Sequence, residues 1–171
     1  MQVRKLQVRE LQVRKLQVCK YAKHVITGLL LAQRQAQGEQ GEKELMTNVR
    51  VLYIEDNAEN RLLVRRVLEA EGYSVLEAAD GSSGLEVAAQ TRPDLILLDI
   101  NLPEIDGYDL ARRFRHMPGL QQVPILAITA NVMKGDRERT LAAGCDGYIQ
   151  KPIDVDRLPE QVRATLRRNH T

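Results

Sequence analysis

Five short apolar runs, separated by longer amphipathic segments, occupy the chain from residue 49 onward. Strands that are covered on both faces lose the alternation of apolar and polar residues, so such runs predict buried parallel strands. The predicted strands are residues 49–55, 73–78, 94–99, 123–129 and 147–151. Helices are predicted at 57–71, after Asp80-Gly81, and at 108–116, 134–143 and 155–168. Five alternating units of this length predict an α/β fold with one doubly wound, five-stranded parallel sheet and five helices.

The first predicted helix has clear signals at both ends. Asn57 is a suitable N-cap residue, and Gly72 is a suitable C-terminal stop. The apolar positions expected to face the sheet are Leu62, Leu63, Val67 and Leu68.

Four of the predicted strands end in polar residues. Glu55-Asp56, Asp99, Thr129 and Lys151 each follow or close an apolar run. The carboxyl ends of parallel strands meet at one edge of the sheet, where open α/β folds bind their ligands. Three carboxylates, a hydroxyl and an ammonium are therefore expected at one edge, which suits a divalent metal and a phosphoryl group.

Asp99 is the candidate for the reactive group. A carboxylate becomes an effective nucleophile toward phosphorus when a metal neutralises the incoming phosphate and holds it in line. Glu55 and Asp56 are candidate ligands, because Mg²⁺ takes oxygen ligands and keeps several waters. Each acid taken alone has a plainer interpretation, as a helix cap or the end of a strand. All three at the ends of successive buried strands favour a site.

Thr129 and Lys151 complete the expected site. A hydroxyl at Thr129 can donate to a phosphoryl oxygen, and the small Ala130 leaves room for it. Lys151 supplies a compact positive charge that balances the acids and can pair with the phosphoryl group. Alone, either residue would be unremarkable at the end of a strand.

Charge and cysteine content narrow the function classes. Residues 1–45 hold nine Lys/Arg and four Glu, whereas residues 46–171 hold sixteen Lys/Arg and nineteen Asp/Glu, a net charge of −3. The second part therefore gives no reason to expect nucleic-acid binding. Two cysteines, Cys19 and Cys145, lack metal-ligand spacing and fit free thiols in a reducing cytoplasm. No apolar stretch approaches the roughly 20 residues of a membrane-spanning helix, so membrane insertion is not expected.

The N-terminal part has a different character. Residues 1–18 repeat a five-residue unit as MQVRK, LQVRE, LQVRK and LQV. Its apolar spacing fits neither a helix nor a strand, and residues 35–44 resemble a flexible linker. One interpretation is a basic tail or a short oligomerising helix. The other, which we favour, is a translated nucleotide repeat, with Met46 as the natural start. Residues 1–45 are thus expected to be a flexible or non-native basic extension.

The polar residues at the strand ends, together with their neighbours, resemble the receiver domain of two-component response regulators over about residues 49–168. The matching positions are Glu55-Asp56, Asp99 with Pro103 and Gly107, Thr129-Ala130, and Tyr148 ahead of Lys151-Pro152. The stretch TANVMKGDRERTLAAGCDGYIQKPI is similar to single-domain regulators of the cell-polarity type and to receivers of hybrid histidine kinases. The resemblance implies a flavodoxin-like sheet with strand order 2-1-3-4-5, and it makes residues 46–171 a receiver domain.

The resemblance also implies roles for single residues. Asp99 would accept a phosphoryl group, with Mg²⁺ bound by Asp56, Asp99 and the backbone carbonyl of Asn101, and by Glu55 through water. Thr129 and Lys151 would contact the phosphoryl group, and Lys151-Pro152 would be a cis peptide. Thr129 and Tyr148 would then move and change the face built by the fourth helix, fifth strand and fifth helix.

The implied function is a phosphorylation-activated switch of a phosphorelay. The donor would be a histidine kinase or a histidine phosphotransfer protein, and output would pass to a protein partner near residues 131–133. The chain would not be an enzyme, although it would assist its own phosphorylation and slow dephosphorylation. An aspartyl phosphatase would carry a second Asp two residues after the first, where this chain has Asn101. The alternatives are a receiver module of a hybrid histidine kinase and an interaction module that takes no phosphate.

The extension generates a first prediction. A chain that starts at Met46 is expected to unfold with the same free energy as the full chain, because residues 1–45 are not expected to contribute to the core. Urea unfolding of the two chains, followed by circular dichroism, measures the difference. A large loss of stability in the shorter chain would show that the extension packs on the domain.

Overall fold

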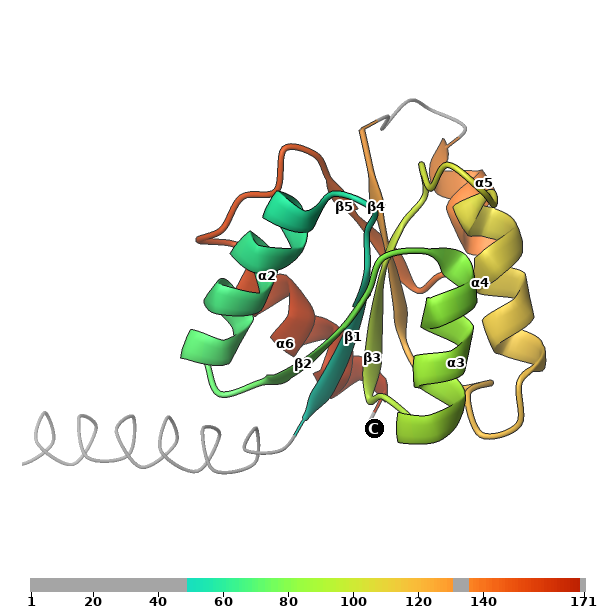
Figure 1. The fold of residues 1–171 in the computed structure, drawn as a ribbon, viewed down its shortest axis with the longest axis horizontal. Coiled ribbons are helices and arrows are strands. Elements are labelled where there is room, and N and C mark those ends of the chain that lie inside the picture. Colours follow the sequence, from blue (N-terminus) through green and yellow to red (C-terminus); the bar gives the residue numbers. More distant parts are fainter. Residues whose placement is uncertain (1–48, 131–135, 170–171) are drawn as a thin grey trace, which may run out of the picture. The chain divides into compact units, whose positions relative to one another are not determined.

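A computed structural model describes residues 49–130 and 136–169 of the chain. In these residues a parallel five-stranded sheet is covered by helices on both faces (Figure 1). The strands are β1 (Arg50–Ile54), β2 (Ser74–Ala78), β3 (Leu95–Asp99), β4 (Ile125–Thr129) and β5 (Gly147–Gln150). The helices are α2 (Ala58–Ala70), α3 (Gly81–Thr91), α4 (Gly107–His116), α5 (Asp136–Ala142) and α6 (Leu158–Asn169). The sheet order β2-β1-β3-β4-β5 confirms the expected fold.

Alternate residues of each central strand enter two separate cores. Leu52 and Ile54 of β1 belong to the cluster that includes residues of α3 and α4, while Val51 and Tyr53 belong to the cluster that includes residues of α2 and α6. Every residue of β3 is buried. Burying one such aliphatic side chain contributes about 1.5–3 kcal/mol, so the two clusters fix the strands and hence the position of their ends.

Helix α2 begins as predicted but faces the sheet with different residues. The side chain of Asn57 accepts hydrogen bonds from the backbone N–H groups of Glu59 and Asn60. The prediction that Leu62 and Leu63 face the sheet is wrong, because their exposed fractions are 39% and 46%. The buried residues are Val64 and Leu68, four apart on one helical face. At about 100° per residue, Leu62 and Leu63 turn away from that face.

Other boundaries differ by a few residues from the prediction. β1 ends at Ile54 and β5 at Gln150, so Glu55 and Lys151 lie just beyond their strands. α6 begins at Leu158 rather than at residue 155, because the Asp154 side chain first accepts bonds from the N–H groups of Asp156 and Arg157 in a turn. The predictions for residues 1–45 and 131–133, and for the start of α5, lie outside the described residues.

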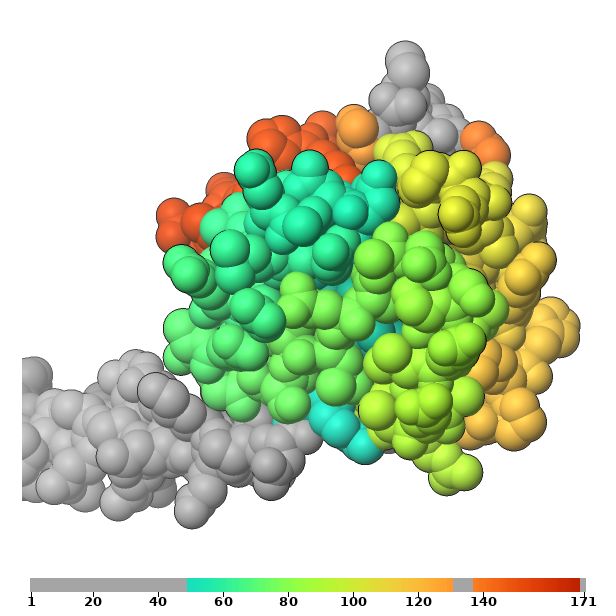
Figure 2. Space-filling model, in the orientation of Figure 1, coloured from blue at the N-terminus to red at the C-terminus, as the bar shows by residue number. Residues whose placement is uncertain are grey.

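Two glycines allow close approaches of α3 and α4 to the ends of β1 and β3. A Cβ atom on Gly84 of α3 would lie 2.6 Å from Cδ1 of Ile54, so glycine lets this helix approach the end of β1. A Cβ on Gly107 would lie 2.5 Å from Cα of Ile100, directly after β3. α3 and α4 lie side by side on this face of the sheet (Figures 1 and 2).

No helix among the described residues has the length and apolar character needed to cross a membrane.

Arg115 of α4 joins several segments at the amino edge of the sheet. Its Nε donates to the carbonyl of Gly144 at 2.8 Å, and its Nη2 donates to Asp146 Oδ2 at 2.7 Å. Its Nη1 donates to three carbonyl oxygens of the loop before β4, nearest to that of Val123 at 2.6 Å. One guanidinium therefore ties α4 to the loop before β4 and to the turn before β5.

Replacing Arg115 by Met keeps much of the aliphatic stem and removes these donors. We expect the free energy of unfolding to fall by about 2–4 kcal/mol, because several partly buried carbonyls and the Asp146 carboxylate each lose a charged donor. Urea unfolding measures it. Arg113→Met is the matched control, since Arg113 is exposed on the same helix. Equal losses in both variants would contradict this role for Arg115.

Candidate functional site

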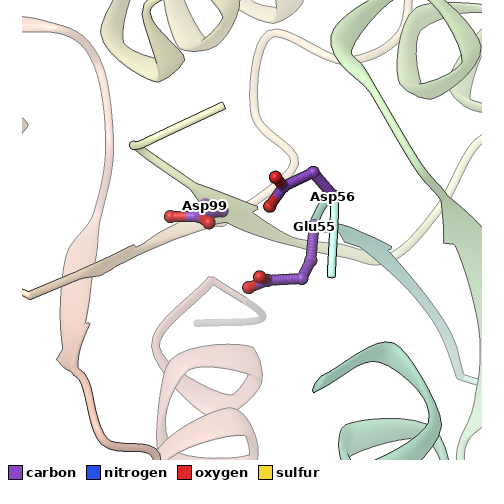
Figure 3. Close-up of side chains that lie close together, drawn as sticks. All are labelled: Glu55, Asp56 and Asp99. Atoms are coloured by element: carbon purple, nitrogen blue, oxygen red, sulfur yellow. The ribbon is translucent and has the colours of Figure 1, made fainter. Parts of the chain in front are cut away.

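The three predicted carboxylates meet at the carboxyl edge of the sheet. Glu55 and Asp56 directly follow β1, and Asp99 ends the neighbouring strand β3. One oxygen from each residue lies within 4.8 Å of the others, and Figure 3 shows the three carboxyl groups gathered at these two strand ends. Glu55 and Asp99 are buried, whereas Asp56 is exposed. The exposed acid gives the cluster an opening to solvent.

Lys151 bridges two of these carboxylates from the end of the edge strand β5. It follows β5, and its Nζ donates to Glu55 Oε2 at 2.9 Å and to Asp99 Oδ2 at 2.8 Å. The peptide bond from Lys151 to Pro152 is cis, as the resemblance implied. Burial would lower the pKa of Lys151, but the two carboxylates outweigh it and raise that pKa above the ordinary value. Lys151 therefore remains an ammonium.

Asp99 carries an electrostatic cost in this position. Its Oδ2 accepts from Lys151, and its Oδ1 accepts from the backbone N–H of Asn101 at 3.0 Å. Burial raises the pKa of Asp99, and the neighbouring Glu55 charge adds to that effect. The two hydrogen bonds oppose the rise without cancelling it. The carboxylate is thus held in place but incompletely compensated, a state that a cation would relieve.

Glu55 is more tightly held than the other two acids. Its Oε1 accepts from Asn60 Nδ2 at 3.0 Å, and its Oε2 accepts from the hydroxyl of Tyr53 at 3.0 Å and from Lys151. Burial would raise the pKa of Glu55, but the Asn60, Lys151 and Tyr53 donors outweigh it and lower that pKa. Glu55 is therefore ionised, with both of its oxygens engaged.

The remaining oxygens suit a hard divalent cation. The cluster has three carboxylates and a single ammonium, which bridges two of them, so the cluster itself carries an excess of negative charge. Among the described residues, the Asp56 side chain makes no hydrogen bond or ion pair. Asp56 and Asp99 could hold Mg²⁺, an ion that prefers oxygen and retains waters, and coordination by the carbonyl of Asn101 stays a prediction. Glu55 fits a role through water, because its oxygens already accept from three donors.

Thr129 and Tyr148 lie on the two strands nearest to Lys151. Thr129 is buried at the end of β4, and its carbonyl accepts from the backbone N–H of Lys151 at 2.8 Å. Tyr148 lies on β5, is half-buried, and packs against the core cluster that includes residues of α4. The structure thus brings Thr129 beside Lys151, whereas Tyr148 lies three residues back along the strand. Their roles as switch residues stay predictions.

Sequence reasoning missed three residues that hold the acidic turn. Tyr53 and Asn60 donate to the Glu55 carboxylate, and Arg61 Nη1 donates to the carbonyls of Glu55 and Asp56 at 2.6 and 2.9 Å. Tyr53 stands two positions before Glu55, and residues two apart on a strand share a face. Asn60 and Arg61 lie in the first turn of α2 and point back toward its start. The spacings of Tyr53 and Asn60 from Glu55 were readable signals, although the two residues also fit an apolar strand and a helix. Arg61 donates to backbone carbonyls here and gave no such signal.

The fold and the site define a class of protein: a doubly wound α/β domain with a lysine-bridged cluster of carboxylates at the carboxyl edge of its sheet. Comparison with known families identifies the member of this class. Residues 51–163 match the response regulator receiver domain, and the chain belongs to that family.

Individual relatives agree with this assignment. The polar-differentiation response regulator DivK of Brucella anthropi is 41% identical over 116 residues, which are 68% of this chain and 94% of DivK. The chemotaxis response regulator CheY4 of Vibrio cholerae superposes with a TM-score of 0.67 at 28% identity, over 70% of this chain and 99% of CheY4. The receiver domain of the sensor histidine kinase PA1611 from Pseudomonas aeruginosa has a TM-score of 0.64 at 36% identity, over 70% and 98% of the two chains. That structure has a magnesium ion coordinated in its active site cleft.

The raised pKa of Asp99 predicts a pH-dependent stability difference. Folding confines the Asp99 charge at a cost when the pH lies above its folded-state pKa, and the cost vanishes below the unfolded value of about 3.8. We therefore expect Asp99→Asn to raise the free energy of unfolding at pH 7 in metal-free buffer. The gain should shrink as the pH falls through this window.

Thermal or urea unfolding between pH 7 and pH 3.5 measures this difference. Asp156→Asn is the control, because Asp156 is an exposed carboxylate outside the acidic cluster. An Asp99→Asn variant that is less stable than the wild type at pH 7 would show that the Lys151 and Asn101 contacts outweigh the cost of burial.

Proposed function

We propose that this chain is a phosphorylation-activated switch in a two-component phosphorelay, with Asp99 as the phosphoacceptor and Mg²⁺ as the cofactor. The observation that carries the proposal is the arrangement around Asp99. This buried carboxylate is held by Lys151 and Asn101 and lies beside Asp56, an exposed acid open to solvent. Membership of the receiver domain family places the chain in two-component signalling. The donor would be a histidine kinase or a histidine phosphotransfer protein in the cytoplasm.

The phosphoryl transfer follows from the residues at the site. An Asp99 carboxylate oxygen attacks the phosphorus of a phosphohistidine, forming a P–O bond as the P–N bond breaks. The imidazole nitrogen leaves with the electron pair and takes up a proton. Bound Mg²⁺ would supply charge neutralisation of the phosphoryl oxygens. Lys151, which contacts Asp99 before transfer, can pair with a phosphoryl oxygen afterwards.

The same geometry suggests how the signal leaves the site. The Thr129 backbone is hydrogen-bonded to Lys151, and its hydroxyl would donate to the new phosphoryl group. Movement of Thr129 and Tyr148 would favour one of two arrangements of the face formed by α5, β5 and α6. The phosphoryl group shifts this equilibrium only as far as its contacts differ between the two arrangements. A downstream protein would read that face.

The chain itself would be phosphorylated and then dephosphorylated, and it would not convert a separate substrate. Each phosphoryl group occupies Asp99 until water hydrolyses the acyl phosphate, which regenerates the carboxylate. We therefore propose a phosphoacceptor that assists its own modification, not an enzyme in the usual sense.

Incubation with Mg²⁺ and acetyl phosphate tests the central step. We expect a single phosphoryl mass adduct on the intact wild-type chain, no adduct on Asp99→Ala, and strong loss of the adduct when EDTA removes the metal. Intact-protein mass spectrometry detects the adduct. Hydroxylamine should remove it, because that nucleophile cleaves an acyl phosphate and spares a phosphoserine.

Asp156→Ala serves as the matched control and should take the phosphoryl group like the wild type. A wild-type chain without an adduct, or an undiminished adduct on Asp99→Ala, would overturn the proposal.

A further inference from the structure

The Tyr53 hydroxyl has no role in the proposed phosphoacceptor function. Its ring is fully buried in the core cluster that includes residues of α2 and α6. Its hydroxyl nevertheless donates to Glu55 Oε2, a group of the acidic cluster, at 3.0 Å. The residue therefore connects the hydrophobic core with the site.

The hydroxyl is not needed for packing. A phenylalanine would fill nearly the same volume without placing a polar atom in the core, where a hydroxyl is costly unless it finds a partner. The partner here is a carboxylate oxygen that also accepts from Lys151. Tyr53 and Lys151 thus converge on one oxygen, and Asn60 occupies the other.

We infer that Tyr53 is a positioning residue that keeps Glu55 directed toward Lys151 and away from direct contact with the metal. The inference rests on the proposed function, because it assigns a task within the same site. Glu55 has one more methylene than an aspartate, so its carboxylate has more freedom to swing toward a cation. The three donors restrict that freedom.

Direct coordination by Glu55 would disturb these hydrogen bonds. An Oε2 that ligates the ion must turn from Tyr53 and from Lys151, and Lys151 would then lose one of the two carboxylates that fix its ammonium. The restrained carboxylate can still accept a hydrogen bond from a metal-bound water, which suits Mg²⁺ because this ion gives up its waters reluctantly. Tyr53 therefore favours placement of Lys151 over affinity for the metal.

The Tyr53→Phe variant tests this inference with two measurements of opposite expected sign. Mg²⁺ should bind the unphosphorylated variant more tightly by about three- to tenfold, the ratio that corresponds to one hydrogen bond, because Glu55 is released toward the ion. The rate constant of phosphorylation by acetyl phosphate at saturating Mg²⁺ should fall by a similar ratio, because Lys151 is less well placed. Calorimetric titration and intact-protein mass spectrometry provide the two values.

Tyr73→Phe is the matched control. Tyr73 lies in the same core cluster, and its buried hydroxyl has no hydrogen-bond partner among the described residues. Removing that hydroxyl should change neither value. A second control places Tyr53→Phe in a Glu55→Ala background, where the hydroxyl has no carboxylate to hold and its loss should have no further effect on either value.

The outcomes separate this inference from the proposed function. Unchanged Mg²⁺ affinity in Tyr53→Phe, or a weakening of both metal binding and phosphorylation, would overturn the positioning role, since mere loosening of the core weakens both. An effect that persists in the Glu55→Ala background would overturn it as well. A wild-type chain that binds Mg²⁺ but takes no phosphoryl group would instead overturn the phosphoacceptor function, while the metal titrations still decide the role of Tyr53.

Discussion

The Lys151 ammonium, shared between Glu55 and Asp99, is the interaction on which the site depends. Both carboxylates are buried, and an oxygen of one lies within 4.8 Å of an oxygen of the other. Without the ammonium, their negative charges would repel each other strongly in a medium of low polarity. Removing the ammonium from such a buried group commonly costs about 3–5 kcal/mol, because the two negative charges left behind have no compensation. The ammonium therefore allows two acids to stay ionised and close together while Asp56 remains open to solvent.

The strand order explains why a lysine fills this position. β5 is separated from β3 by β4, so two strand spacings, about 10 Å, lie between the strand that precedes Lys151 and the strand that ends at Asp99. The four-carbon stem of a lysine covers much of that distance and brings a compact charge to its end. The sheet supplies the rest of the geometry. Its faces are closed by helices, so polar side chains that must meet do so at its edge (Figure 1).

The sheet and the main residues of the site were predictable because both follow from strong local patterns. Runs such as residues 94–99 have no polar alternation, and a buried parallel strand is their physical consequence. The acids and the lysine end those runs, so the topology alone brings them together.

What the sequence did not predict depends on tertiary contacts. Residues 62–64, 67 and 68 are all apolar, and only the position of the sheet selects Val64 and Leu68 as the buried pair. Tyr53 was counted as one more member of an apolar strand, although its hydroxyl is its important atom. The contact of Arg61 with the acidic turn gave no signal, because its acceptors there are backbone carbonyls, which every sequence possesses.

The contacts of Arg115 at the amino edge of the sheet restrict how α5 can move. Its guanidinium binds the carbonyl of Gly144 and the carboxylate of Asp146, just after α5, and so anchors the C-terminal end of that helix to α4. The guanidinium of Arg139 lies over the ring of Tyr108, 5.0 Å from its centroid, and adds a softer contact between the same two helices. A helix that is held at one end can rotate about that end more easily than it can translate along its axis. If α5 is displaced, its displacement would therefore be smallest beside Arg115 and would grow along the helix toward the carboxyl edge of the sheet.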